Sequence, residues 1–91
     1  MSSIDKLIET LEILRDAVWA KNKDKGFDAV TIFLMQFMDT FGSSQNMVTR
    51  TLPILEELKD HILSGEFEEA NPVVLALLVR LRQVREAIEN S

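Results

Sequence analysis

The sequence predicts an all-α protein folded as an antiparallel four-helix bundle. Four stretches of its 91 residues carry apolar residues at every third or fourth position, and short polar segments separate them. Short connections force neighbouring helices to run in opposite directions. Hydrophobic residues make up 46% of the chain and charged residues 27%, which is typical of a folded protein. We expect residues 1–91 to form a single helical domain.

The first predicted helix begins at Ile4, and its apolar residues keep the spacing of one helix face. They are Ile4, Leu7, Ile8, Leu11, Leu14 and Val18, with Trp19 on the flank. The segment KNKDKG, residues 21–26, follows and has no periodic apolar residue. Its mixed charges, Asn22 and Gly26 predict a short turn to the next helix.

The second predicted helix is the most apolar stretch, running from about Phe27 and stopping near Gly42. Glycine readily adopts the left-handed conformation that closes a helix. At 100° per residue, a core stripe covers about 140° of one face. It contains Phe27, Val30, Phe33, Leu34, Phe37, Met38 and Phe41. The same geometry places Ile32 and Met35 on the reverse face, so another subunit or a bent third helix has to cover them.

The third predicted helix extends from about Gln45 to Leu63. Its stripe consists of Met47, Val48, Leu52, Leu55, Leu58 and Ile62. Because the periodicity keeps its phase across Pro53, we predict one helix bent at this proline. The alternative is a new helix with Pro53 in its first turn, preceded by a short helical turn.

The fourth predicted helix starts at Asn71 and Pro72, in the order of a cap and a first-turn proline, and runs to about Glu89. Its stripe consists of Val74, Leu77, Leu78, Leu81, Val84 and Ile88. Leu75 and Val79 point away from that stripe, with Ala76 beside them. Like Ile32 and Met35, these residues are apolar but lie outside the stripe that the core would bury.

The segment GEFEEA, residues 65–70, resembles the turn between the two helices of a tetratricopeptide repeat. Gly65, Phe67 and Ala70 occupy the places of that pattern. The resemblance covers six residues and implies a helical turn, while Asn71 and Pro72 interrupt the expected second helix. A second copy of the repeat is missing, so no function is carried over.

Charge and composition exclude several classes of function. A formal net charge of −5 opposes nonspecific attraction to nucleic acid. The absence of cysteine excludes disulfides and thiolate sites. The amino terminus carries Asp5, Glu9 and Glu12, unlike a signal peptide, and the longest apolar helix would span only about 22 Å. We expect a cytoplasmic protein without a membrane span.

Candidate chemical groups are few. His61 and Glu57 have a spacing that suits two metal ligands, but a metal site in a bundle needs further ligands from other helices. An acidic row on the first helix, namely Glu9, Glu12 and Asp16, points outward and is interpreted as a solubilising face. Lysines of KNKDK and the arginines near Arg80 are interpreted as solvated or paired. We predict no catalytic residue, no metal ligand and no cofactor.

The functional hypothesis is a small non-enzymatic protein acting through protein–protein interaction, as a homodimer or with another protein partner. The predicted interface consists of Ile32, Met35, Leu75, Ala76 and Val79, because exposed apolar clusters mark partner surfaces. One alternative is binding of a lipid or other hydrophobic small molecule among the phenylalanines of the second helix. Another is a small chaperone or antitoxin that captures a partner helix.

Overall fold

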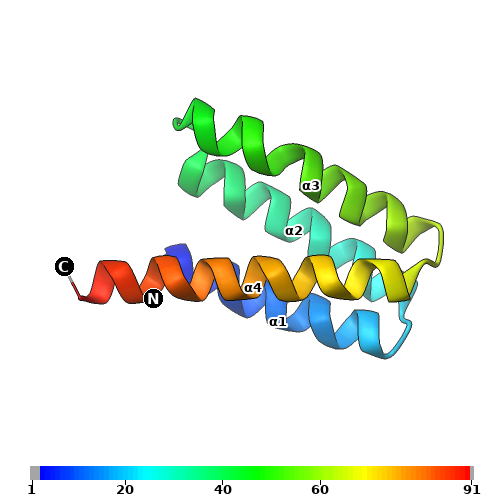
Figure 1. Cartoon of the computed structure of the whole chain (residues 1–91). Helices are drawn as coiled ribbons and strands as arrows, with labels where there is room; N and C mark the ends of the chain where they lie inside the picture. Colours follow the sequence, from blue (N-terminus) through cyan, green and yellow to red (C-terminus); the bar gives the residue numbers. More distant parts are fainter. Residues whose placement is uncertain (1–2, 91) are drawn as a thin grey trace.

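A computed structural model describes residues 3–90, and every element in that range is an α-helix (Figure 1). The helices are α1 (Ser3–Trp19), α2 (Lys23–Phe41), α3 (Gln45–Leu63) and α4 (Phe67–Glu89). Successive helices pack on one another and α1 also packs on α4, which closes the ring. The predicted all-α bundle is confirmed. The start of α1 and the end of α4 lie at the same end of the molecule (Figure 1).

One hydrophobic cluster fills the centre of the ring. Its largest fully buried side chains are Phe33, Phe37, Leu7, Leu11, Leu14, Leu55, Leu58, Ile62, Leu78, Val30 and Val74. All eleven belong to the predicted stripes. The stripe of the second helix was drawn too wide, however, because Phe27 is 36% exposed and Met38 42% exposed. These two residues lie together at one edge of the stripe, where neighbouring helices no longer cover them, whereas Phe33 at the other edge is buried.

The turn between α1 and α2 is shorter than predicted. Helix α2 begins at Lys23, so most of the segment KNKDKG is helical. Lys21 takes a left-handed conformation with φ 54°, and the Asn22 side chain accepts a hydrogen bond from the Lys25 N–H at 3.1 Å. Asn22 is therefore the N-cap of α2. Asp24 follows in the first turn, where the helix dipole favours a carboxylate.

Gly42 follows the last residue of α2, as predicted, but its φ of −60° is right-handed. It therefore does not close the helix in the expected way. The side chain of Ser44 then caps α3 by accepting a hydrogen bond from the Met47 N–H at 3.4 Å. Helix α3 is continuous across Pro53, so the alternative of two separate helices is wrong. The bend at Pro53 stays a prediction.

Helix α4 begins at Phe67, four residues before the predicted cap. Gly65 takes φ 74° at the turn, and Ala70 in the first turns of α4 is fully buried. Because Ala70 packs in the core, the segment before Pro72 is helical. Pro72 therefore lies inside α4, and Asn71 does not cap the helix. Pro72 cannot donate to the carbonyl of Glu68, but Glu68 is exposed to water, which can take that bond.

Candidate functional site: a groove between α3 and α4

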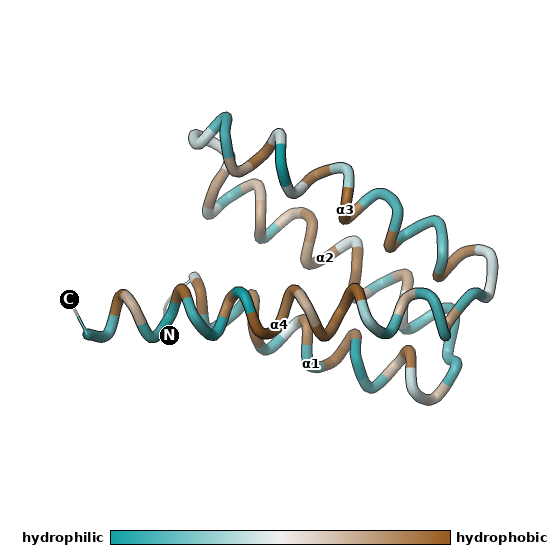
Figure 2. The backbone as a smooth tube through the Cα atoms, in the orientation of Figure 1, coloured by the Kyte–Doolittle hydropathy of each residue, from teal (hydrophilic) through white to brown (hydrophobic). Residues whose placement is uncertain are grey.

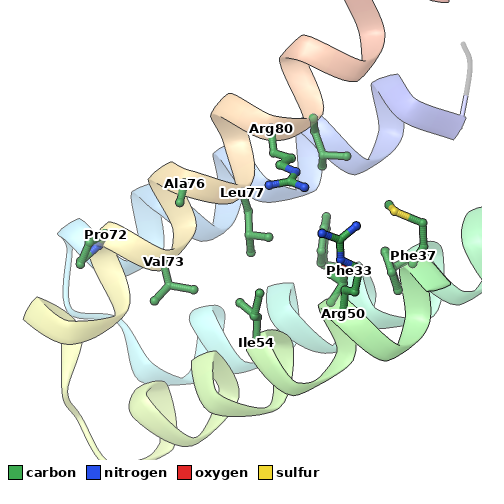
Figure 3. Close-up of a pocket in the computed structure, with 12 residues that line it drawn as sticks. Phe33, Phe37, Arg50, Ile54, Pro72, Val73, Ala76, Leu77 and Arg80 are labelled. Carbon is green, nitrogen blue, oxygen red and sulfur yellow. The ribbon is translucent and has the colours of Figure 1, made fainter.

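Helices α3 and α4 pack less closely than the other neighbouring pairs and diverge from the turn at Gly65 (Figure 1). A groove of about 510 Å³ lies between them. Twelve residues of α2, α3 and α4 line it: Phe33, Phe37, Met47, Arg50, Thr51, Ile54, Pro72, Val73, Ala76, Leu77, Arg80 and Leu81. Figure 3 shows Ile54 and Arg50 on the α3 wall, with Val73, Leu77 and Arg80 on the α4 wall.

The uneven burial of α3 explains why the groove exists. In the second half of the helix, Leu55, Leu58 and Ile62 are buried to 2% exposure or less. In the first half, Met47 and Val48 are only partly buried against the core. Phe33 and Phe37 of α2, each 1% exposed, form the floor below this half. Closely packed side chains therefore hold one end of α3, and its other end leaves apolar surface open.

The apolar surface of α4 extends beyond what the bundle buries. The middle of this helix is mostly hydrophobic, and its two ends are hydrophilic (Figure 2). Val74, Leu78 and Leu81 enter the core, whereas Val73 and Leu77 are only partly buried. The two partly buried residues line the groove. One side of α4 thus remains free to contact another apolar surface.

Two arginines stand at the groove, one on each wall. In Figure 3 the guanidinium groups of Arg50 and Arg80 turn toward one another across the opening. The groove lining contains these two positive charges and no carboxylate. A like-charged pair facing an apolar channel is a receptive arrangement for an anionic group, because guanidinium forms two parallel hydrogen bonds to one carboxylate.

The other three arginines of the chain are all paired with carboxylates. Arg15 contacts Asp16 at 3.3 Å, Arg82 contacts Glu12 at 3.5 Å, and Arg85 contacts Asp5 at 3.6 Å. Within residues 3–90, no such ion pair involves Arg50 or Arg80. The groove arginines are therefore the unneutralised ones.

The structure leaves all five predicted interface residues exposed but does not bring them together in one place. Ile32 and Met35 of α2 are 49% and 64% exposed, so α3 does not cover them. Leu75 and Val79 of α4 are 38% and 54% exposed. The fifth residue, Ala76, lines the groove. That these residues form an interface stays a prediction.

Side-chain contacts show where the two exposed pairs lie. The Thr10 hydroxyl donates to Gln36 Oε1 at 2.7 Å, which fixes α1 against α2. In an antiparallel pair, the next turn then brings Ile13, 43% exposed, level with Ile32. We call Ile13, Ile32 and Met35 the α1–α2 patch.

Leu75 lies one turn after Asn71, on the opposite flank of α1. Asn71 Oδ1 accepts a hydrogen bond from Trp19 Nε1 at 2.7 Å. Helix α1 contacts both α2 and α4 and lies between them. In the acidic row of α1, Glu12 pairs with Arg82 of α4. This row therefore lies between the α1–α2 patch and the exposed residues Leu75 and Val79.

His61 lies at the turn end of α3 and contacts two carboxylates. Its Nε2 is 3.5 Å from Glu57 and its Nδ1 is 3.1 Å from Glu66. The hydrogen bond with Glu66 raises the pKa of His61, burial opposes that shift, and Glu57 adds to it. Among residues 3–90, no three His, Cys, Asp or Glu side chains form a group that could hold a metal ion.

Comparisons of the chain with protein-family models, curated proteins and solved structures find no match. None of the helices within residues 3–90 is long and apolar enough to cross a lipid bilayer.

The groove was not predicted from the sequence. Pro72, Val73 and Leu77 belonged to an expected helix, but nothing in the periodicity indicates how far α3 stands from α4. Part of its lining was among the predicted residues, namely Ala76 of the predicted interface and two phenylalanines of the hydrophobic-ligand alternative. A further signal is Ile54, which lies outside the predicted stripe of the third helix and is 42% exposed. Like Ile32, it is an apolar residue that the core does not use.

Proposed function

We propose that this protein is a non-enzymatic interaction module that captures an amphipathic helix of a partner protein in the groove between α3 and α4. The observation that carries the proposal is an open apolar channel with helices for walls and Phe33 and Phe37 for a floor. Amphipathic helices bind other proteins by placing one apolar face in such a channel.

The length of the groove suits a helix. Its α4 wall extends from Pro72 to Leu81, which at a rise of 1.5 Å per residue is about 13 Å. Three anchor side chains at positions i, i+4 and i+7 of a bound helix span about 10.5 Å. The groove therefore accommodates three anchors on consecutive turns.

The energy of such anchoring is moderate. Burying one large aliphatic side chain contributes roughly 1.5–3 kcal/mol, so three contribute about 5–9 kcal/mol. Association costs about 4–15 kcal/mol in lost translational and rotational freedom. Apolar anchors alone thus support weak binding at most, and a stable complex needs polar contacts at the groove in addition.

Site-specific photocrosslinking in the native host tests the proposal. The photoreactive residue p-benzoylphenylalanine replaces Ala76 on the groove wall, or Glu9 on the exposed face of α1 as the matched control. We expect a protein adduct at position 76 that is absent at position 9, with its crosslinked peptide in an amphipathic helical segment. Equal adducts at both positions, or none at position 76, would reject helix capture.

Native mass spectrometry of the purified protein separates helix capture from binding of a hydrophobic small molecule. The groove volume of about 510 Å³ also falls within the range of small-ligand pockets. A reproducible bound small-molecule mass that disappears in the variant Ile54→Gln/Ala76→Gln would favour the small molecule over a helix.

Self-association is a second candidate, and the exposure of Ile32, Met35 and Val79 favours it. A dimer through the α1–α2 patch, or through Leu75 and Val79 on α4, would bury apolar side chains without involving the groove arginines. Sedimentation of the wild type beside the variant Ile32→Lys/Leu75→Lys tests it, with Lys6→Glu as a charge-altering control. A wild type that stays monomeric at high micromolar concentration would reject the dimer.

A further inference from the structure

We propose that Arg50 and Arg80 form an anion clamp, and that the captured helix carries an aspartate or glutamate one turn from its apolar anchors. The inference rests on the proposed function and specifies the chemistry of the partner. The clamp residues lie on different helices, and their guanidinium groups turn toward each other over the channel (Figure 3).

The charge distribution of the molecule supports this assignment. The chain has a formal net charge of −5, yet the groove lining carries two arginines and no acidic residue. Other arginines of α4 turn toward α1, where Arg82 contacts Glu12 and Arg85 contacts Asp5. The positive charge at the groove is therefore local, and an acidic ligand would find it complementary.

The same arginines disfavour a second copy of this chain seated groove to groove. A two-fold contact places the same surface of both subunits together. Four guanidinium groups would then meet around one apolar channel without a carboxylate from either lining. This argument favours a different partner that brings the anion with it.

The position of Arg80 defines where the acidic residue lies on the partner. Along α4, the groove residues Val73 and Leu77 are one turn apart, and Arg80 lies on the following turn. Residues three or four apart on a helix are neighbours at about 5–6 Å. A partner helix whose anchors fill the channel beside Val73 and Leu77 therefore presents its carboxylate one turn beyond an anchor.

Two fluorescent dyes with the same aromatic body test the clamp without knowledge of the partner. The dye 1-anilinonaphthalene-8-sulfonate carries an anion that stands in for the carboxylate, and N-phenyl-1-naphthylamine lacks it. Each dye is titrated into the wild type and into the variant Arg50→Gln/Arg80→Gln. The variant Arg82→Gln is the matched control, because Arg82 lies on the same helix and pairs with Glu12 away from the groove.

We expect Arg50→Gln/Arg80→Gln to weaken binding of the sulfonate dye by roughly tenfold or more, since hydrogen bonds to charged groups are the stronger kind. Binding of the neutral dye should change by less than about twofold, because the apolar lining is intact. Arg82→Gln should leave both dyes as in the wild type. Circular dichroism confirms that each variant is folded.

The outcomes distinguish the clamp from the groove. If the sulfonate dye binds Arg50→Gln/Arg80→Gln as tightly as the wild type, the clamp is rejected while the groove stands. If neither dye binds, or if Ile54→Gln/Ala76→Gln weakens neither, the apolar groove is not a binding site and the proposed function fails with it. Equal weakening of the sulfonate dye by Arg82→Gln would indicate a general charge effect and would also reject the clamp.

Discussion

At the residue scale, His61 joins the end of α3 to the start of α4. Its backbone carbonyl accepts a hydrogen bond from the Glu66 N–H at 2.7 Å, and its ring contacts the Glu66 carboxylate at 3.1 Å. Glu66 is also the residue immediately before α4 and forms no side-chain cap hydrogen bond with that helix. The two residues therefore link the two helices that flank the groove.

This arrangement predicts a pH dependence of stability. Because the hydrogen bond with Glu66 raises the folded-state pKa of His61 above 6.5, the protonated ring stabilises the fold. The stabilisation is fully present below the unfolded pKa and is lost as pH rises through the folded pKa. We expect the advantage of the wild type over His61→Gln, measured as a urea midpoint, to shrink from about pH 5.5 to about pH 8.5.

The variant Glu66→Gln is the control for that measurement, since it removes the carboxylate that contributes most to the raised pKa. In its background, His61→Gln should have a smaller dependence on pH. A difference between wild type and His61→Gln that stays constant over this range would show that protonation of His61 does not stabilise the fold.

At the scale of elements, α1 and α3 end in the same hydrogen-bonding motif. A different type of residue takes the left-handed conformation in each. Asn22 N–H donates to the Ala17 carbonyl and Lys21 N–H to that of Val18. At the end of α3, the corresponding donors are Glu66 and Gly65. Both are Schellman motifs, in which a left-handed residue directs the chain away from the helix. One contains Lys21 with φ 54° and the other Gly65 with φ 74°.

These two motifs predict that replacing Lys21 by glycine and replacing Gly65 by alanine change the stability in opposite directions. A residue with a side chain loses roughly 1–2 kcal/mol in the left-handed conformation, and glycine avoids this cost. Glycine also has more conformational freedom in the unfolded chain, which reduces its advantage by about 0.5–1 kcal/mol. Lys21→Gly should therefore raise the free energy of unfolding by about 0.5–1 kcal/mol, and Gly65→Ala should lower it by a similar amount. Chemical denaturation of the two variants measures both, and shifts of the same sign would contradict the shared motif.

The element boundaries show how local and tertiary effects combine. Ser44 and Gly65 mark ends that lie close to the predicted ones. Asn71 and Pro72 have the sequence order of a helix start, yet the helix begins at Phe67 because Phe67 and Ala70 pack on the core. A contact between residues distant in the sequence outweighed a local signal there.

At the scale of the whole molecule, α1 makes the two most extensive helix–helix contacts of the ring, with α2 and with α4. Its Leu11 is 0% exposed and belongs to the shared core, whereas Ile32 on the neighbouring helix is 49% exposed. Truncating these two side chains to alanine should therefore lower the free energy of unfolding by different amounts.

Leu11→Ala should lower the free energy of unfolding by about 2–5 kcal/mol, because it removes buried atoms and leaves a cavity. That is a large fraction of the roughly 5–15 kcal/mol typical of a folded domain. Ile32→Ala should change it by only about 0.5 kcal/mol in the monomer. Urea denaturation at low protein concentration compares them, and similar losses for both variants would contradict the packing.

The sequence alone determined the helical class, the number of helices and most of the core, because apolar spacing is a local property that survives in any arrangement of the helices. It also showed that Ile32, Met35, Leu75 and Val79 lie outside the core stripes, and the structure leaves them exposed. The tertiary structure decided where α4 begins and how far α3 stands from it. The groove depends on the relative placement of two helices, and so does the position of Arg50 opposite Arg80 across it. Long-range packing of side chains sets that placement, and no local sequence pattern indicates it.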